Sequence, residues 1–244
     1  MNAERNSLLP ARIGIGLSIV LFGLPALLLW VATHKVVPGL VGQGWEPLAA
    51  WFLAGGVLVF GPLLAAALTV AWLSVPRPSP AAILEHLRVR RLTGSDWRLA
   101  LATLIVTLAA MAGLQAVNAA IWPGLPPHPP FMAVRALEPA QYYLLALWLP
   151  FFAANIVGEE LWWRGAIQPR QEPVFGRATW IVQGLLHGAF HISFGAGLLF
   201  VLLPVLFSIP WAVQRSQNTT VGMVVHAGVN GPGFLAVTFG LLPV

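Results

Sequence analysis

Two adjacent glutamates, Glu159 and Glu160, follow a long apolar run and lie just before Arg164. On a helix, residues four positions apart share a face, so Glu160 and Arg164 are predicted to form an ion pair whose order suits the helix dipole. Glu159 points about 100° away from that face and stays available for another task. A carboxylate left free in this way can act as a general base. The alternative is that both glutamates only anchor a helix end at the membrane interface.

Two further polar pairs follow at the same four-residue spacing. His187 and His191 form the first pair, and His226 and Asn230 form the second. A single histidine in a membrane helix is more often a hydrogen-bonded helix contact than a functional group. Polar pairs on three successive helices are costly in lipid unless they face a common interior. We therefore expect all three pairs to line one cavity.

The remaining residue types narrow the chemistry by elimination. Cysteine is absent and Asp96 is the only aspartate, which excludes a thiol nucleophile and an aspartyl protease with two catalytic aspartates. There is no His-Glu-x-x-His sequence and no Gly-x-Ser-x-Gly elbow, and Ser193 and Ser208 lack a nucleophile's setting. Glutamate, histidine and asparagine remain, and these can activate a water molecule and stabilise an oxyanion.

The composition indicates that the elements positioning these residues are membrane helices. The chain is 58% hydrophobic and 9% charged, with a mean hydropathy of +0.79, whereas soluble domains carry about 25% charged residues. The net charge of +5 does not indicate nucleic-acid binding, because the basic residues lie in loops between apolar spans. We interpret them as topology signals.

Eight apolar segments are predicted to be helices, which gives an all-α, polytopic membrane bundle with a polar cavity in its C-terminal half. They are residues 13–33, 48–75, 99–122, 141–167, 178–194, 196–213, 219–230 and 234–244. Only the second half carries ionisable residues in its spans. We expect one integrated membrane domain in which residues 1–98 form scaffold helices and a basic loop, and residues 99–244 form the catalytic bundle.

The arginine-rich loop between the second and third spans is expected in the cytoplasm, with a short amphipathic surface helix. The amino terminus, with Arg5 and Arg12, is then cytoplasmic as well. The expected location is a bacterial inner membrane.

Three motifs together resemble a known family. In chain order they are Glu159-Glu160-x-x-x-Arg164, Leu185-Leu186-His187-Gly188-Ala189-Phe190-His191 and His226-x-x-x-Asn230. This set resembles the CPBP intramembrane proteases, also called the Abi or CAAX-protease family. The resemblance implies a compact bundle of helices with a cavity open toward the membrane and cytosol. It also implies hydrolysis of a peptide bond in a prenylated or carboxyl-terminally anchored membrane substrate.

The resemblance assigns a role to each motif residue. Glu159 would be the base that activates water, and His191 would help to orient that water. Glu160 and Arg164 would brace Glu159. His226 and Asn230 would form the oxyanion hole. This implies a glutamic-type endopeptidase without a cofactor, acting on a membrane-anchored protein or peptide in the lipid bilayer.

One position departs from the family pattern. The second motif usually reads Phe-x-x-x-His, and here the phenylalanine position is His187. A zinc-dependent version of the protease is therefore an alternative, with His187, His191, His226 and Glu159 as candidate ligands. The expected depth along the helix brings His187 closer to the glutamates, whereas the motif favours His191 as the catalytic histidine.

Two other function classes fit the same polar cavity. One is a non-catalytic membrane protein, such as an immunity factor, that binds a peptide. The other is a small transporter that uses the carboxylate pair to couple protons. Replacement of Glu159 by glutamine keeps the shape of the side chain and removes the base. Loss of substrate cleavage in this variant would therefore separate a protease from these two classes.

Overall fold

The computed structural model describes residues 7–126, 128–129 and 136–241, and every regular element in these ranges is a helix. Six helical stretches there are long and apolar enough to cross a membrane, by length and composition. In chain order they are Ile15–Gly42, Pro47–Ser74, Gly94–Ile121, Tyr143–Phe194, Ala196–Ser216 and Thr219–Thr238. The predicted all-α, polytopic bundle is therefore confirmed. Arg5 and the end of the expected helix 234–244 lie outside the described residues.

The first two stretches each contain a wider, π-helical turn in the middle. The first consists of α1 (Ile15–Val31), η1 (Ala32–Val36) and α2 (Val37–Gly42). The second consists of α3 (Pro47–Gly55), η2 (Gly56–Phe60) and α4 (Gly61–Ser74). The surface helix expected in the arginine-rich loop is α5 (Pro80–His86), which begins where the Ser79 hydroxyl accepts from the Ala82 backbone N–H.

The third stretch is the single helix α6 (Gly94–Ile121). It begins at a capping box, in which Thr93 and Asp96 each accept a hydrogen bond from the other's backbone N–H. Large apolar side chains such as Ile105 and Val106 are each 67% exposed on its outer side. In an integral membrane protein, such a surface contacts lipid tails.

The stretch Tyr143–Phe194 contains two of the predicted spans, 141–167 and 178–194. Its elements follow the short η3 (Pro139–Gln141) and are α7 (Tyr143–Glu159), η4 (Glu160–Ile167), α8 (Gln168–Phe175), η5 (Gly176–Ala178), α9 (Thr179–Phe190) and η6 (His191–Phe194). The chain turns back between α8 and α9 at Gly176, whose φ of +54° favours glycine.

The last two predicted helices, 219–230 and 234–244, are wrong as separate elements. After α10 (Ala196–Ser216), one helix, α11 (Thr219–Thr238), continues through Gly231, Pro232 and Gly233. A proline inside a helix removes one backbone hydrogen bond, and membrane helices tolerate this where neighbouring groups satisfy the freed carbonyl. The predicted count of eight helices is therefore not confirmed.

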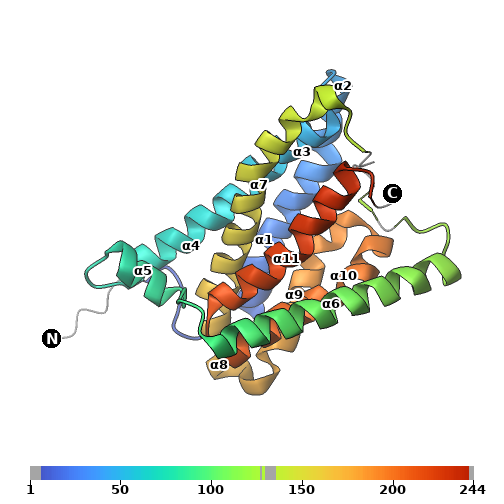
Figure 1. The fold of residues 1–244 in the computed structure, drawn as a ribbon. Coiled ribbons are helices and arrows are strands. Elements are labelled where there is room, and N and C mark those ends of the chain that lie inside the picture. The colour runs from blue at the N-terminus through green and yellow to red at the C-terminus, as the bar shows by residue number, and fades with distance from the viewer. Residues whose placement is uncertain (1–6, 127, 130–135, 242–244) are drawn as a thin grey trace.

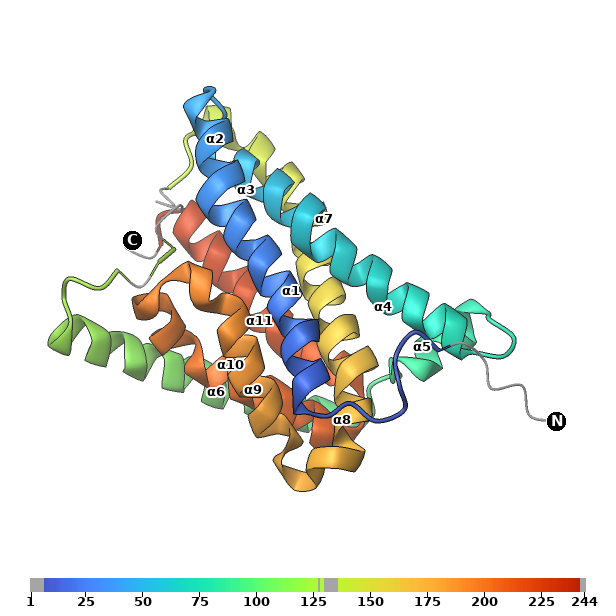
Figure 2. The same ribbon diagram turned by 180° about the vertical axis from the view of Figure 1, so that it is seen from behind.

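The segment that carries the glutamates lies at the centre of the bundle. η4 contacts α4, α7, α8 and α11. α6 packs on α10 and α11, and α1 packs on α9 from the opposite side (Figures 1 and 2). Elements far apart in the sequence therefore meet around η4, and the helices near the amino terminus form part of its surroundings.

A carboxylate on α8 holds together the end of the bundle where α5 lies. Both Arg88 Nη1 and Nη2 donate to Glu172 at 3.0 Å, and Gln217 Nε2 donates to it at 3.1 Å. Arg88 and Gln217 are the only non-glycine residues in the described ranges with positive φ, at +55° and +54°. Glu172 thus stabilises two strained backbone positions, one after α5 and one between α10 and α11.

We expect Glu172→Ala to lower the free energy of unfolding by about 1–3 kcal/mol, because it removes hydrogen bonds to a partly buried charge. Thermal unfolding of the purified protein in detergent measures this. Glu85→Ala is the control, since Glu85 is an exposed carboxylate on α5. Equal stability of the two variants would contradict the role given to Glu172.

Candidate active site

The candidate site is built around a π-helical segment. η4 begins at Glu160, directly after Glu159 ends α7, and all eight of its residues are buried. Single π-helical turns inside α-helices occur frequently at functional sites. Here the segment carries the first motif into the centre of the bundle, where α9 and α11 bring the second and third motifs.

Glu160 is held by two partners in the fully buried centre. Its Oε1 lies 3.3 Å from Arg164 Nη1, and both side chains have 0% exposure. The same oxygen lies 2.9 Å from His226 Nδ1 on α11. The predicted ion pair between Glu160 and Arg164 is therefore present, and its carboxylate also contacts the third motif.

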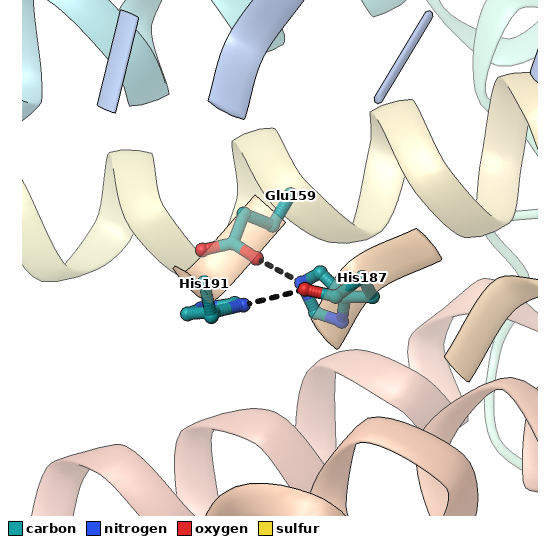
Figure 3. A group of neighbouring side chains, drawn as sticks. All are labelled: Glu159, His187 and His191. Carbon is teal, nitrogen blue, oxygen red and sulfur yellow. Dashed lines mark hydrogen bonds and ion pairs between the residues drawn. The ribbon is translucent and has the colours of Figure 1, made fainter. Parts of the chain in front are cut away.

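Glu159 faces a different set of partners. Its Oε2 lies 2.8 Å from His187 Nε2, and its Oε1 accepts a hydrogen bond of 2.6 Å from Asn155 Nδ2. Figure 3 shows Glu159 pointing toward His187 and His191. The predicted separation of the two glutamates onto different faces is therefore found in the structure.

His187 connects the two halves of the site. Its Nδ1 lies 3.0 Å from Arg164 Nη2, and a guanidinium has donors only, so Nδ1 must accept. In a neutral imidazole the proton is then on Nε2, which donates to Glu159. The expectation from helix depth that His187 lies close to the glutamates agrees with this geometry.

His191 lies beside this pair without joining it. Its Nδ1 lies 3.0 Å from the carbonyl oxygen of His187, so Nδ1 carries the proton and donates (Figure 3). The Nε2 atom then has a free lone pair, and no hydrogen bond to it is found among the described residues. His191 lines the same cavity as Glu159. Both histidines of the second motif are thus near Glu159, one in direct contact and one with an open nitrogen.

The third motif completes the site from α11. Asn230 Nδ2 lies 3.1 Å from His226 Nε2, and the same amide donates to Asn155 Oδ1 at 3.3 Å. His226 therefore contacts Glu160 through one nitrogen and Asn230 through the other. All six predicted catalytic residues, and His187, come together in one place: Glu159, Glu160, Arg164, His191, His226 and Asn230.

Asn155 is the residue that sequence reasoning missed. It is not ionisable and lies alone among apolar residues of α7, so a search for charged and titratable groups passes over it. The available signal was its position four residues before Glu159, which places both side chains on one helix face. This is the same spacing that pairs Glu160 with Arg164.

A glycine on α11 allows Glu160 to approach. A Cβ at Gly222 would lie 2.5 Å from Glu160 Oε2 and 2.8 Å from a Val213 methyl carbon, which is closer than real Cβ contacts. We expect Gly222→Ala to destabilise the fold by about 1–3 kcal/mol, because overpacking moves buried groups off their positions. Thermal unfolding in detergent checks this. Gly113→Ala on α6, where a Cβ meets nothing within 4 Å, should leave stability unchanged or raised.

The site lies at one end of an apolar cavity of about 660 Å³. Its polar end is formed by Asn155, Glu159, His187, His191, His226 and Asn230. Its aromatic walls are formed by Trp51, Phe52, Phe60, Trp148, Phe151, Phe152, Phe194 and Phe234. Along α7, Trp148 and Glu159 are about 16 Å apart at 1.5 Å per residue. Gln115 and His128 also line the cavity. The cavity is thus lined mainly by aromatic and aliphatic side chains, with the motif residues grouped at Glu159.

Three of the four candidate zinc ligands come together, since donor atoms of Glu159, His187 and His191 lie within 4.8 Å of one another. His226 instead contacts Glu160. The donor chemistry of His187 does not fit a metal ligand. A ligating histidine donates its second ring N–H to an acceptor, whereas His187 Nδ1 accepts from Arg164 and Nε2 holds the proton.

Residues 141–231 match the family model described as type II CAAX prenyl endopeptidase Rce1-like. The match begins just before α7 and ends within α11, so it contains all three motifs. No curated protein and no solved structure matches the chain. The family match confirms the resemblance, and with the six membrane-length helical stretches it supports an integral membrane endopeptidase of the CAAX type.

Proposed function

We propose that this chain, a member of the type II CAAX prenyl endopeptidase family by its residues 141–231, cleaves a membrane-associated substrate with water activated by Glu159. The observation that carries the proposal is the placement of Glu159. Its carboxylate is fixed by Asn155 and His187 and lines the cavity beside the open Nε2 of His191. A general base and an acceptor for the second water proton are thus side by side.

In the proposed reaction, a water molecule donates one hydrogen bond to Glu159 and the other to His191 Nε2. The water oxygen attacks the scissile carbonyl carbon as its proton passes to Glu159. A tetrahedral oxyanion forms, its carbon–nitrogen bond then breaks, and the proton on Glu159 passes to the leaving amine. The second water proton passes from the new carboxylic acid to the amine, so the products are a carboxylate and an ammonium group.

Asn230 is the proposed donor to the oxyanion, through the side-chain N–H that points to His226 in the free protein and turns to the oxyanion as it forms; its other N–H stays on Asn155. In the free protein, His226 Nε2 accepts from Asn230, so His226 adds a second donor only when that nitrogen gains a proton. Glu160, at His226 Nδ1, would balance the resulting charge. Arg164 therefore holds His187, and Glu160 holds His226.

The proposed substrate is a protein or peptide with a prenyl group or an apolar carboxyl-terminal anchor. A cavity lined mainly by aromatic and aliphatic side chains, with the motif residues grouped at Glu159, suits an apolar chain whose scissile bond lies beside Glu159. We place the end of the bundle near α5 in the cytoplasm of a bacterial inner membrane, since exposed arginines such as Arg90 and Arg91 gather there.

The test uses purified protein in liposomes with two peptides, one prenylated on a cysteine near its carboxyl end and one with a carboxyl-terminal apolar helix. Mass spectrometry should detect a cleaved product of at least one of them. Binding without cleavage would favour a peptide-binding or immunity protein. Flux of substrate into sealed vesicles without product would favour a transporter. Either result with no cleavage would overturn the protease proposal.

We propose a metal-free, glutamic-type mechanism over the zinc alternative. What supports it is the donation of Arg164 to His187 Nδ1, which keeps the proton on the nitrogen that a metal would need. We expect activity to survive treatment with a chelator, and elemental analysis of active protein to show far less than one zinc per chain. Stoichiometric zinc, with activity lost to chelator and restored by zinc, would overturn this.

A further inference from the structure

We propose that Asn155 is a positioning residue, which fixes both Glu159 and the amide of Asn230 for the reaction. This inference rests on the proposed function, because it assigns Asn155 a part in the same hydrolysis. Asn155 is 8% exposed and belongs to none of the three motifs. Its importance comes from the contacts that it makes on both sides.

Asn155 closes a ring of seven side chains that joins all three motifs. In order around the ring they are Glu159, Asn155, Asn230, His226, Glu160, Arg164 and His187. Each neighbour in the ring lies within 3.3 Å of the next. Without Asn155, Glu159 and Asn230 are connected only through the four other members of the ring.

Each hydrogen bond in the ring can have only one donor and one acceptor, and the ionised groups determine which is which. A carboxylate only accepts and a guanidinium only donates. The amide NH₂ of Asn155 must therefore face Glu159, and its carbonyl oxygen must face Asn230. Only the NH₂ group of Asn230 can donate to that oxygen, so Asn155 and the accepting His226 Nε2 together fix how the Asn230 amide is held.

This orientation matters because an oxyanion needs an N–H and is repelled by a carbonyl oxygen. If Asn155 lost its carbonyl oxygen, the Asn230 amide would be held by His226 Nε2 alone, and its NH₂ group could turn away from the position that it needs for the oxyanion. Glu159 would also lose the donor that holds Oε1. Both groups would then be misplaced by small rotations, which costs rate much more than substrate binding.

The test measures cleavage of whichever liposome peptide the wild-type protein cuts. Asn155→Leu keeps the approximate shape and removes both hydrogen bonds. We expect kcat to fall about 10- to 100-fold with KM changed less than about 3-fold. The matched control is Asn118→Leu, a buried asparagine on α6 that donates to the Leu125 carbonyl oxygen, and it should keep wild-type kcat.

A double variant identifies the partner through which Asn155 acts. Asn155→Leu in the Asn230→Ala background should lower kcat by less than it does in the wild-type background, because the amide that Asn155 orients is already gone and only the loss of the donor to Glu159 remains. If Asn155→Leu fails to fold, Asn155→Ser replaces it, since a serine hydroxyl is too short to reach both partners. The same limits on kcat and KM then apply.

The outcomes separate the two proposals. Wild-type kcat in Asn155→Leu or Asn155→Ser, in a protein that cleaves the peptide, overturns the positioning role alone. A full 10- to 100-fold loss in the Asn230→Ala background would overturn the role of Asn155 on Asn230, because Asn155 would then act through Glu159 alone. If wild-type protein cleaves neither peptide, the proposed function fails and the positioning role fails with it.

Discussion

Glu159→Gln is expected to lower kcat by about 10³- to 10⁴-fold on the liposome peptides while the helical fold is kept. General-base catalysis contributes about 10²- to 10⁴-fold, and a glutamine amide cannot take a proton from water. Cleavage is measured by mass spectrometry after prolonged incubation. This is the largest effect on activity that the site predicts, because no other carboxylate lines the cavity within the described part of the chain.

The same substitution has a predictable effect on stability. Asn155 and His187 both donate to Glu159, and glutamine offers an acceptor to only one of them. A buried donor left without an acceptor costs about 1–3 kcal/mol, so the variant should unfold at a lower temperature. The exposed Glu85→Gln on α5 is the control for both measurements. Cleavage by Glu159→Gln at the wild-type rate would show that Glu159 is not the base.

Arg164→Met is expected to produce the largest loss of stability, about 3–5 kcal/mol. Arg164 and Glu160 are completely buried, and removal of one member of a buried ion pair leaves an uncompensated charge. His187 Nδ1 also loses its donor. The free energy of unfolding is obtained from thermal or denaturant unfolding in detergent, and activity should fall as well because His187 then no longer has a fixed proton.

The double variant Glu160→Gln with Arg164→Met is the control for this prediction. It removes both charges, and His226 can still donate to the glutamine carbonyl oxygen. Replacement of a whole buried pair is often much less harmful than loss of one partner. We therefore expect the double variant to be more stable than Arg164→Met. A double variant that is less stable than the single one would mean that Arg164 acts mainly by packing.

Much of the site is predictable from local spacing. The four-residue spacing pairs Glu160 with Arg164 and turns Glu159 to another face, and these relations survive because both residues lie on one continuous helical segment. The shared cavity was predictable in part, because polar side chains in apolar helices need one another: the second and third pairs line it with Glu159, whereas Glu160 and Arg164 are fully buried and do not line it. Contacts between different helices were not predictable in detail. His226 is 66 positions from Glu160, and no local rule selects Glu160 over Glu159 as its partner.

The sequence by itself determined the class of the molecule, the motifs and the residue types available for chemistry. These follow from composition and from periodicity along single helices. Only the tertiary structure decided that His187 contacts Glu159 while His191 keeps an open nitrogen, that α11 is one helix through Pro232, and that Asn155 closes the ring. Each of these depends on how helices pack against one another, since the partners come from different elements and their orientations are set by burial and by hydrogen bonding.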